Sequence, residues 1–380
     1  MKTVNKVLIV GGGIAGLTTA IALHKKGIVA EIIEKHPSWS VYGVGIIQPS
    51  NMLRALKSIG LGDACLENGC GFNGWEFHDT KDNLLVRIPS ENVAGEGYPP
   101  VNGITRISLH NILLDAVKAQ GTSIRLGVTL SSWEDGSDGI EVVCSDGSRE
   151  KYDLLIGADG AYSQIRSMFY GEEIKPQFTG QAVWRYNVEK PKGMDWGRFY
   201  YGEKSKAGLI PLSEDLMYLL LVTAEPGNPQ MPNEKLADIL RERLAEYSDC
   251  FIGSLVEKIV DSSAVVYRPL EVFAAEKPWH KGRVLLIGDA AHSGTPHLAE
   301  GAAMAIEDGV ILADMLADST ELDSTLTAFA ERRFDRVHLV YTTGLKIGEM
   351  EQAQWAGEDV DQDLMGKLLA DAHNELMNPA

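Results

Sequence analysis

The chain has 380 residues, with 35 Lys and Arg against 53 Asp and Glu, so its formal net charge is −18 at pH 7. This acidity argues against nucleic acid and anionic membranes as partners, because both bind basic patches. Hydrophobic residues make up 44% and charged residues 23%, which is typical of a folded globular protein, and the length suits two or three domains. No apolar run is long enough to predict a membrane span, and the four cysteines lack metal-ligand spacing, so we expect a cytoplasmic protein without a metal site.

The N-terminal segment predicts a strand, a helix and a second strand. Lys6–Val10 is a short apolar run that ends in glycines, as buried parallel strands do. Ile14–Lys26 has apolar residues at helical spacing and stops at Gly27, and Val29–Glu34 is again strand-like. This βαβ start predicts an α/β domain.

The α/β pattern continues to about residue 175. Helices are expected at Asn51–Gly60 and Ser108–Ala119, and strands at Ser123–Trp133, Gly139–Ser145 and Tyr152–Ala158. The composition then becomes aromatic and β-branched, which favours a sheet. Its expected elements are strands at Gln181–Val188, Arg198–Gly202, Ala207–Pro211 and Leu216–Val222 and a helix at Asn233–Tyr247.

The last third of the chain returns to the first pattern. Arg283–Ile287 predicts a buried strand, Ala299–Leu316 a long helix, and the chain from Gln354 onward a helical tail whose acidic run is typical of a solvated face. We therefore divide the chain into a discontinuous α/β domain (1–74, 100–175 and 269–345), an inserted, mainly β domain (75–99 and 176–268) and an acidic helical tail (346–380).

A glycine-rich turn follows the first strand. Gly11, Gly13 and Gly16 fit GxGxxG, in which the glycines allow a tight turn, close approach of a pyrophosphate and close helix packing. Glu34 follows at the end of the second strand, where an acid binds a ribose hydroxyl. These features predict a dinucleotide site, and the acid favours FAD or NAD over NADP. The alternative is a glycine turn kept for packing alone.

Two more buried strands end in an acid. Asp159-Gly160 follows the strand that ends near Ala158, and taken alone it is most simply a capped strand–turn–helix. Asp289 ends the strand that begins at Arg283, at the edge where open α/β sheets bind ligands. His292 and His297 follow it, and each alone is more typical of packing than of catalysis.

With the three motifs in this order, the chain from about residue 5 to 345 resembles the class A FAD-dependent aromatic monooxygenases, single-component enzymes that use NAD(P)H. The resemblance implies a Rossmann-like FAD-binding domain with the β domain inserted as the substrate domain. It also implies tight, non-covalent FAD, transient NAD(P)H, and hydroxylation of a small aromatic or N-heteroaromatic substrate with O2 through a flavin C4a-hydroperoxide. A monomer or homodimer is expected.

The resemblance also assigns site residues. Glu34 would bind the adenosine ribose, Leu130 would lie by the adenine, Asp289 would bind the ribityl chain, and Asp159 would serve both FAD and NAD(P)H. The complete set of implied cofactor-binding residues is Gly11, Gly13, Ala15, Gly16, Glu34, Lys35, Gly45, Ile47, Arg106, Leu130, Asp159, Asp289, Pro296, Gly301 and Ala302.

Two positions depart from the family pattern. Ala299-Glu300-Gly301 stands where the family has Gly-Gln-Gly, which adds an acid near the flavin. The segment around it is most similar to the branch of 6-hydroxynicotinate, salicylate and urate hydroxylases. Ile47, however, replaces the histidine of the 6-hydroxynicotinate enzymes, which argues against hydroxynicotinate as the substrate.

The substrate pocket is expected on the strands of the inserted domain. Arg185 is a candidate partner for a carboxylate, and Tyr201, Tyr218 and His297 are candidates to deprotonate or hydrogen-bond a phenol. Each has a structural alternative, the tyrosines as sheet core and Arg185 in a surface ion pair. Other functions considered are an FAD-dependent reductase or halogenase, although the halogenase WxWxIP segment is absent, and a non-catalytic FAD redox sensor.

Overall fold

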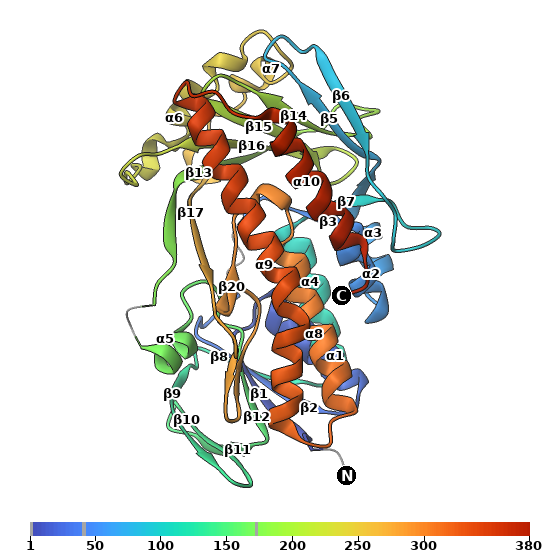
Figure 1. The fold of residues 1–380 in the computed structure, drawn as a ribbon, viewed down its shortest axis with the longest axis vertical. Coiled ribbons are helices and arrows are strands. Elements are labelled where there is room, and N and C mark those ends of the chain that lie inside the picture. The colour runs from blue at the N-terminus through green and yellow to red at the C-terminus, as the bar shows by residue number, and fades with distance from the viewer. Residues whose placement is uncertain (1–2, 40–42, 172–173) are drawn as a thin grey trace.

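Within residues 3–39, 43–171 and 174–380, which this computed structural model describes, the strands form four sheets (Figure 1). The six-stranded sheet has the order β18-β19-β12-β1-β2-β8 and is parallel except at β18. Its strands are β1 (Lys6–Val10), β2 (Val29–Glu34), β8 (Ser123–Leu126), β12 (Leu154–Gly157), β18 (His280–Lys281) and β19 (Val284–Leu286). Burial explains the apolar runs, because helices cover these central strands.

The helices are arranged around this sheet and along the second domain. Their bounds are α1 (Ile14–Lys25), α2 (Ser50–Ser58), α3 (Gly62–Glu67), α4 (Arg106–Ala119), α5 (Gln164–Tyr170), α6 (Leu236–Arg243), α7 (Gly253–Val256), α8 (Gly301–Ala317), α9 (Leu322–Trp355) and α10 (Gln362–Met377). Single 3-10 turns lie at η1 (Asn233–Lys235), η2 (Ala245–Tyr247), η3 (Ser262–Ala264), η4 (Gly288–Ala290) and η5 (Pro296–Leu298). α1 packs along α8, and Gly309 permits the approach because a Cβ there would lie 2.7 Å from the Thr19 hydroxyl.

The eight-stranded sheet has the order β20-β17-β13-β16-β15-β14-β5-β6 and lies above the six-stranded sheet in Figure 1. Its strands are β5 (Gly74–His78), β6 (Leu84–Pro89), β13 (Gln177–Glu189), β14 (Gly197–Tyr201), β15 (Ser205–Pro211), β16 (Leu216–Ala224), β17 (Val266–Ala274) and β20 (His292–Ser293). The inserted mainly β part predicted from composition is thus present in the fold.

Two three-stranded sheets complete the described strands. One joins β3 (Gly45–Pro49), β7 (Val101–Thr105) and β4 (Gly69–Phe72), and the other joins β9 (Leu130–Gly136), β10 (Gly139–Cys144) and β11 (Arg149–Tyr152). The single strand predicted at Ser123–Trp133 is wrong, because β8 and β9 belong to different sheets. Gly127, at φ +71°, turns the chain between them. The helix predicted at Asn233–Tyr247 is likewise divided into η1, α6 and η2.

Alternation along the strands gives the eight-stranded sheet two different faces. One face packs with α6 and α7 around Trp184 and Tyr247. The other, which we call the inner face, packs against β3 and β7. It carries Val183, Arg185, Tyr201, Lys206, Ile210, Tyr218, Leu220 and Val222. The inner face therefore points toward the α/β part of the molecule.

The C-terminal helices run beside both parts. α9 has 34 residues and extends along the six-stranded and the eight-stranded sheets, with α10 folded back next to it (Figure 1). Arg54 and Arg336 hold the end of α10 by donating to the carbonyls of Met377 and Leu376. The acidic run at 358–363 is exposed, as predicted, but Ala372 and Leu376 of α10 are fully buried.

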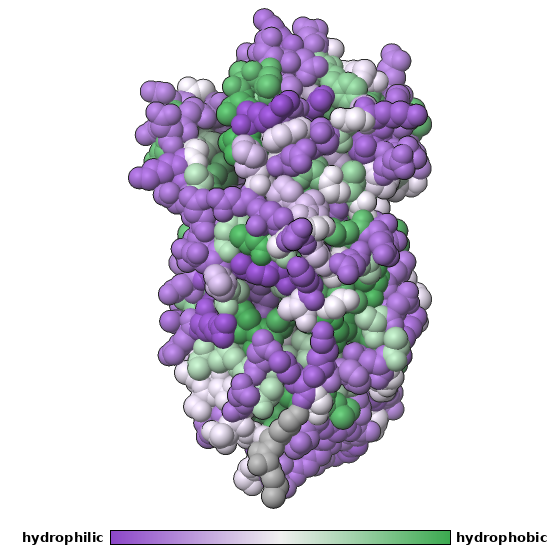
Figure 2. Space-filling model, turned by 90° about the vertical axis from the view of Figure 1, so that its right-hand side faces the viewer, coloured by the Kyte–Doolittle hydropathy of each residue, from purple (hydrophilic) through white to green (hydrophobic). Residues whose placement is uncertain are grey.

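The surface agrees with the acidic composition. In Figure 2 one face is mostly hydrophilic, and its hydrophobic residues lie in small, separate groups. None of the described helices is both long and apolar enough to cross a membrane.

Candidate functional site

The glycine turn between β1 and α1 has the backbone that the motif requires. Gly11 adopts φ +111°, and a Cβ there would overlap the Ala158 carbonyl. A Cβ at Gly16 would overlap the Gly11 carbonyl, so this position needs glycine for close packing. Gly13 has open space around its Cβ position, whereas Ala15 is buried. The turn therefore exposes backbone at Gly13 at the N-terminus of a helix, a place that suits a phosphate.

Glu34 reaches back to this turn. Its Oε2 accepts a hydrogen bond of 2.9 Å from the Gly12 amide, and its Oε1 accepts one of 2.9 Å from the His36 amide. The neighbouring Lys35 is exposed. Trp39 lies over Gly12, since a Cβ there would be 2.7 Å from its ring. The predicted ribose-binding acid and the glycine turn are thus one structural unit.

Arg106, the first residue of α4, lies between the α/β part of the molecule and the inner face of the eight-stranded sheet. A Cβ at Gly43 would be 3.1 Å from Arg106 Cδ, and a Cβ at Gly45 would be 2.5 Å from the ring of Tyr218. Desolvation lowers the pKa of Arg106, and Asp289 and Tyr218 oppose that shift. The two glycines thus bring the Gly43–Ile47 segment against both Arg106 and the eight-stranded sheet.

Asp289 stands in η4, directly after β19. It is exposed although Gly288 and Ala290 beside it are buried. Desolvation nevertheless raises the pKa of Asp289, with His292, Arg106 and Arg166 acting in the opposite direction. An accessible carboxylate that is surrounded by protein in this way can accept hydrogen bonds from a bound molecule.

Arg166 connects the turn at Asp159-Gly160 with η4, the turn that contains Asp289. It is 1% exposed, its Nη1 donates to the Ala290 carbonyl at 3.1 Å, and its guanidinium lies 4.2 Å from the centre of the Phe273 ring. Ser163 caps α5, because its hydroxyl accepts from the Arg166 amide at 2.9 Å, and Asp159 accepts from the Gln164 amide at 2.7 Å and from the Ser163 hydroxyl. The capped strand–turn–helix interpretation is confirmed, and the coenzyme role of Asp159 stays a prediction.

The loop before α8 contains η5 and a left-handed residue, Ala299, at φ 60°. Pro296 begins η5, and Gly301 and Ala302 begin α8. Glu300 between them is fully buried. Its Oε2 accepts 2.9 Å from Asn51 Nδ2, and its Oε1 has no partner among the described residues. Desolvation raises the pKa of Glu300 to about 8.

A buried ion network lies under this loop. Asp308 accepts from His292 Nε2 at 2.6 Å and from Arg333 Nε at 2.8 Å, and Glu307 pairs with Arg333 and Arg336 at 2.9 Å. The charges are nearly fully buried and mutually compensated. The packing interpretation of His292 is therefore confirmed.

A second buried cluster contains residues that the sequence did not predict. Glu351 of α9 pairs with Lys206 of the inner face, accepts from Gln181 Nε2 at 3.1 Å and bonds His297 Nε2 at 3.1 Å. Burial raises the pKa of Glu351, but Lys206 and His297 outweigh that effect and lower it to about 2. Tyr201 lies directly opposite Lys206 on the neighbouring strand.

The predicted substrate residues therefore form two groups. His297 and Tyr201 belong to the Glu351 cluster, and the His297 side chain is only 1% exposed. Arg185 and Tyr218 lie on the inner face near Arg106. Desolvation raises the pKa of Tyr218 to about 12. Leu130 is buried in the core, and Ile47 is buried against the inner face.

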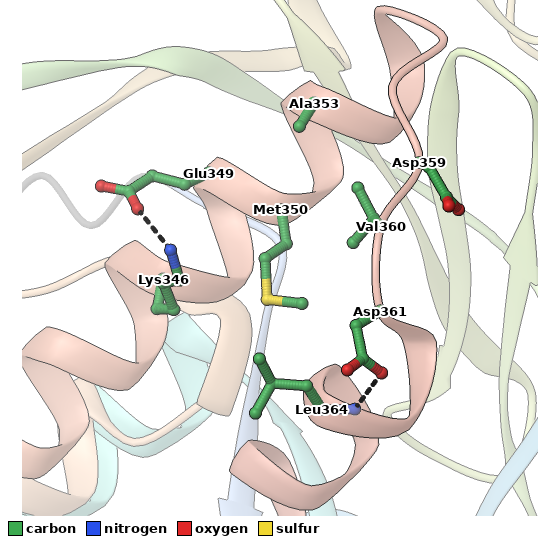
Figure 3. Close-up of a pocket in the computed structure, with 8 residues that line it drawn as sticks. All are labelled: Lys346, Glu349, Met350, Ala353, Asp359, Val360, Asp361 and Leu364. Atoms are coloured by element: carbon green, nitrogen blue, oxygen red, sulfur yellow. Dashed lines mark hydrogen bonds and ion pairs between the residues drawn. The ribbon is translucent and has the colours of Figure 1, made fainter.

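The missed residues had only a weak signal. Lys206 interrupts a strand whose other residues are apolar or small, and Glu351 lies in the predicted tail. A pocket of about 330 Å³ also lies between the end of α9 and the start of α10, with Glu349, Asp359 and Asp361 on its rim (Figure 3). It contains none of the predicted site residues. Among the described residues no group of His, Cys, Asp or Glu is arranged to hold a metal ion.

Comparisons with known proteins agree with this geometry. The pattern of the FAD binding domain family matches residues 5–342. YetM of Bacillus subtilis (strain 168), provisionally named an FAD-dependent monooxygenase, is 32% identical over 96% of this chain and 98% of its own. The 2-heptyl-3-hydroxy-4(1H)-quinolone synthase of Pseudomonas aeruginosa (strain UCBPP-PA14) is 31% identical over 91% of this chain and 89% of its own.

A solved structure shows the same fold. HpxO of Klebsiella pneumoniae, crystallised with FAD and uric acid, superposes with a TM-score of 0.81 at 23% identity and covers 99% of this chain and 93% of its own. The Rossmann-like part, the inserted sheet and the helical C-terminal segment all lie within this match. The chain belongs to the FAD binding domain family, in its branch of single-component FAD-dependent aromatic monooxygenases.

Proposed function

We propose that this protein uses NAD(P)H and O2 to hydroxylate a ring carbon of a small aromatic or N-heteroaromatic substrate. The observation that carries the proposal is the close approach of Gly45 to Tyr218. Gly45 belongs to the segment that the family resemblance puts beside the flavin ring, and Tyr218 belongs to the inner face. A flat substrate bound there would lie between the cofactor and the sheet.

The residues present fit FAD. The open backbone at Gly13, the glycine-turn acid Glu34, the guanidinium of Arg106 and the accessible carboxylate of Asp289 are the groups that would hold it. When bound, FAD would take reducing equivalents from NAD(P)H and supply the O2 chemistry that protein side chains lack.

The protein's own contribution is to orient the ring and exclude water. The apolar cluster of the inner face, which includes Val183, Ile210 and Leu220, would enclose a planar ring. Tyr218 would stay protonated at neutral pH, because its pKa is raised to about 12, so it would donate a hydrogen bond rather than act as a base. The names of relatives support N-heteroaromatic rings, since a quinolone and uric acid occur among them.

The test is substrate-dependent turnover of the FAD-loaded protein. We would screen hydroxybenzoates, hydroxypyridines, urate and 4(1H)-quinolones for those that accelerate NAD(P)H oxidation, and repeat the reaction under ¹⁸O2. One labelled oxygen atom in the product is expected, whereas an aromatic that only mimics the substrate should release hydrogen peroxide. Label derived from water, or product formed without O2, would contradict the proposal.

A further inference from the structure

Glu300 is an acid whose carboxyl group is buried at the start of a long helix. It is the residue before α8, which has 17 residues, and it has no exposed surface. Asn51 Nδ2 donates to its Oε2 at 2.9 Å, while its Oε1 has no hydrogen-bond partner among the residues that the structure describes. One oxygen of a fully buried acid is therefore left unsatisfied by the protein.

The cations around Glu300 are already balanced by other acids. Arg333 donates to Glu307 and to Asp308, and Arg336 donates to Glu307 through two nitrogens. A third buried carboxylate at Glu300 would lack a counter-ion, so the balance of charges favours the protonated acid. Desolvation, which raises the pKa of Glu300 to about 8, agrees with this balance. The charged groups around Glu300 and its neighbour Glu307 are Arg54 on α2 and Arg333 and Arg336 on α9.

The start of α8 borders the groups that fit FAD. A Cβ at Gly288 in η4 would lie 2.8 Å from Ala15 in α1 and 3.4 Å from Ala305 in α8. α8 also contacts β3, whose first residue, Gly45, lies against the inner face (Figure 1). The N-terminal end of α8 carries the positive end of the helix dipole, which acts on a molecule bound beside it. A charge on Glu300 would therefore change the potential at the cofactor.

This arrangement couples an acid to the charge of the cofactor. We propose that Glu300 takes up a proton when the bound FAD is reduced. Reduction by two electrons and one proton leaves one additional negative charge on the flavin ring, and a negative charge nearby disfavours the ionised form of a carboxyl group. At a pH where Glu300 is ionised beside oxidised FAD, reduction therefore consumes two protons, of which one binds the flavin and one binds the Glu300 carboxylate. The electrons come from NAD(P)H in the proposed reaction.

The coupling is a property of this chain, because it requires the acid. A glutamine in the same position, as in the Gly-Gln-Gly pattern, could donate a hydrogen bond but could not exchange a proton. The inference concerns the cofactor alone. It therefore does not depend on which substrate is hydroxylated.

The test is the pH dependence of the flavin midpoint potential. FAD-loaded protein would be reduced slowly without oxygen, in the presence of reference dyes, at a series of pH values. From about pH 7 to about pH 8 the potential should fall with the slope of one proton per two electrons, and above about pH 8 this slope should roughly double. The absorbance of the oxidised flavin should show a one-proton transition at the pH where the slope changes.

Three variants assign the transition. Glu300→Gln should abolish both the change of slope and the absorbance transition. Asn51→Leu removes a hydrogen bond that favours the ionised acid, so it should move both to higher pH. Asp314→Asn is the matched control, because Asp314 is an exposed acid near the other end of α8, where it pairs with Lys26. This control should behave as the unmodified protein does.

Three results would overturn the inference. They are a single slope above pH 7 in the unmodified protein, a change of slope that persists in Glu300→Gln, and a change of slope that is lost in Asp314→Asn. The shift expected in Asn51→Leu separates titration of Glu300 from a structural role, because a side chain that only packs has no transition to move. None of these measurements needs a substrate. A failed hydroxylation assay with the doubled slope intact would therefore contradict the proposed function and leave this role of Glu300 in place.

Discussion

Glu300 is the residue at which this chain departs most clearly from the family's Gly-Gln-Gly, and its environment makes it resemble the glutamine that it replaces. It is fully buried, Asn51 donates to one of its oxygens, and desolvation raises its pKa to about 8. At neutral pH the side chain is therefore mostly protonated and uncharged. The substitution changes the chemistry of the loop only when the pH approaches this value.

The effect of Glu300 on stability follows from the sign of its shift. Because its pKa is higher in the folded than in the unfolded chain, the folded state binds the extra proton, and Glu300 destabilises the fold increasingly as the pH rises from about 5 to 8. Glu300→Gln removes this dependence. We expect the melting temperature of the variant to exceed that of the unmodified protein by several degrees at pH 8 and by much less at pH 5. Glu349→Gln, at an exposed site, is the control, and a pH-independent difference would argue against a buried neutral acid.

The role predicted for Asp289 is testable through FAD retention. Asp289→Ala removes an accessible carboxylate beside η4, and the loss of a charged acceptor should weaken FAD binding about 10- to 100-fold. The measurement is the dissociation constant from flavin fluorescence together with the FAD content after gel filtration. Asp359→Ala, in the exposed acidic run, should leave both values unchanged. An unaltered dissociation constant in Asp289→Ala would remove this residue from the site.

Residues in motifs with fixed local spacing could be predicted from the sequence, and residues brought together only by packing could not. Gly11, Gly16 and Asp289 are recognisable because a strand and the turn after it determine their surroundings. Glu351 and Lys206 are separated by 145 residues and meet only because α9 crosses the inner face. Their side chains carry no local pattern that distinguishes them from surface charges.

At the scale of elements, α9 can approach the sheet because of a stripe of glycines. A Cβ at Gly344 would overlap the Thr295 hydroxyl, and one at Gly348 would lie 2.7 Å from Gln181 Oε1 and 3.3 Å from His297 Cε1. Glu351 lies one turn further on the same side. The sequence predicted helical structure only from Gln354 onward, so most of α9 was not predicted.

The glycine stripe predicts a position-dependent response to alanine. Gly348→Ala should destabilise the protein by about 1–3 kcal/mol, because the new methyl group displaces Gln181 and His297 from Glu351. Gly366→Ala is the matched control, since nothing lies within 4 Å of its Cβ position in α10. It should be neutral or stabilising by about 0.5–1 kcal/mol through helix propensity. Urea unfolding of both variants measures the difference, and equal effects would show that the stripe has no packing role.

The order of strands and helices could be predicted from hydrophobic patterning. The errors in the predicted strand bounds arose where that hydrophobic pattern does not change from one element to the next. The run from Ser123 to Trp133 is strand-like on both sides of Gly127, so the backbone turn at this glycine was not predicted. Which sheet a strand joins depends on the strands with which it pairs, and those strands lie far along the chain. Local sequence therefore predicted that these residues are extended without predicting where the sheet ends.

At the scale of the whole molecule, buried charges join parts that are distant in sequence. The Glu351 cluster links α9, the inner face and the loop of η5, and the Glu307–Asp308 network links α8 to α9. Each cluster is nearly neutral as a unit. Removing one member therefore leaves an uncompensated buried charge, which is more costly than removing the pair.

This arrangement predicts a specific double-mutant result. Glu351→Gln should destabilise the protein by about 3–5 kcal/mol, because Lys206 stays buried without its counter-ion. Adding Lys206→Met should recover most of that loss. Since the pKa of Glu351 is lowered to about 2, its stabilisation should be complete above about pH 5 and should decrease as the pH falls toward 2. Unfolding curves at pH 3 and 7 test both statements, and additive losses in the double variant would contradict a coupled pair.

The spacing between the two ionic clusters along α9 has a consequence for how such a chain can evolve. Arg333 and Glu351 are 18 residues apart, about five turns, so both project from one side of the helix at a separation of roughly 27 Å. Inserting or deleting one residue between them would rotate one contact by roughly 100° relative to the other. We expect this stretch to accept many substitutions but few changes of length. The length of α9 would therefore set the distance between the two ionic clusters.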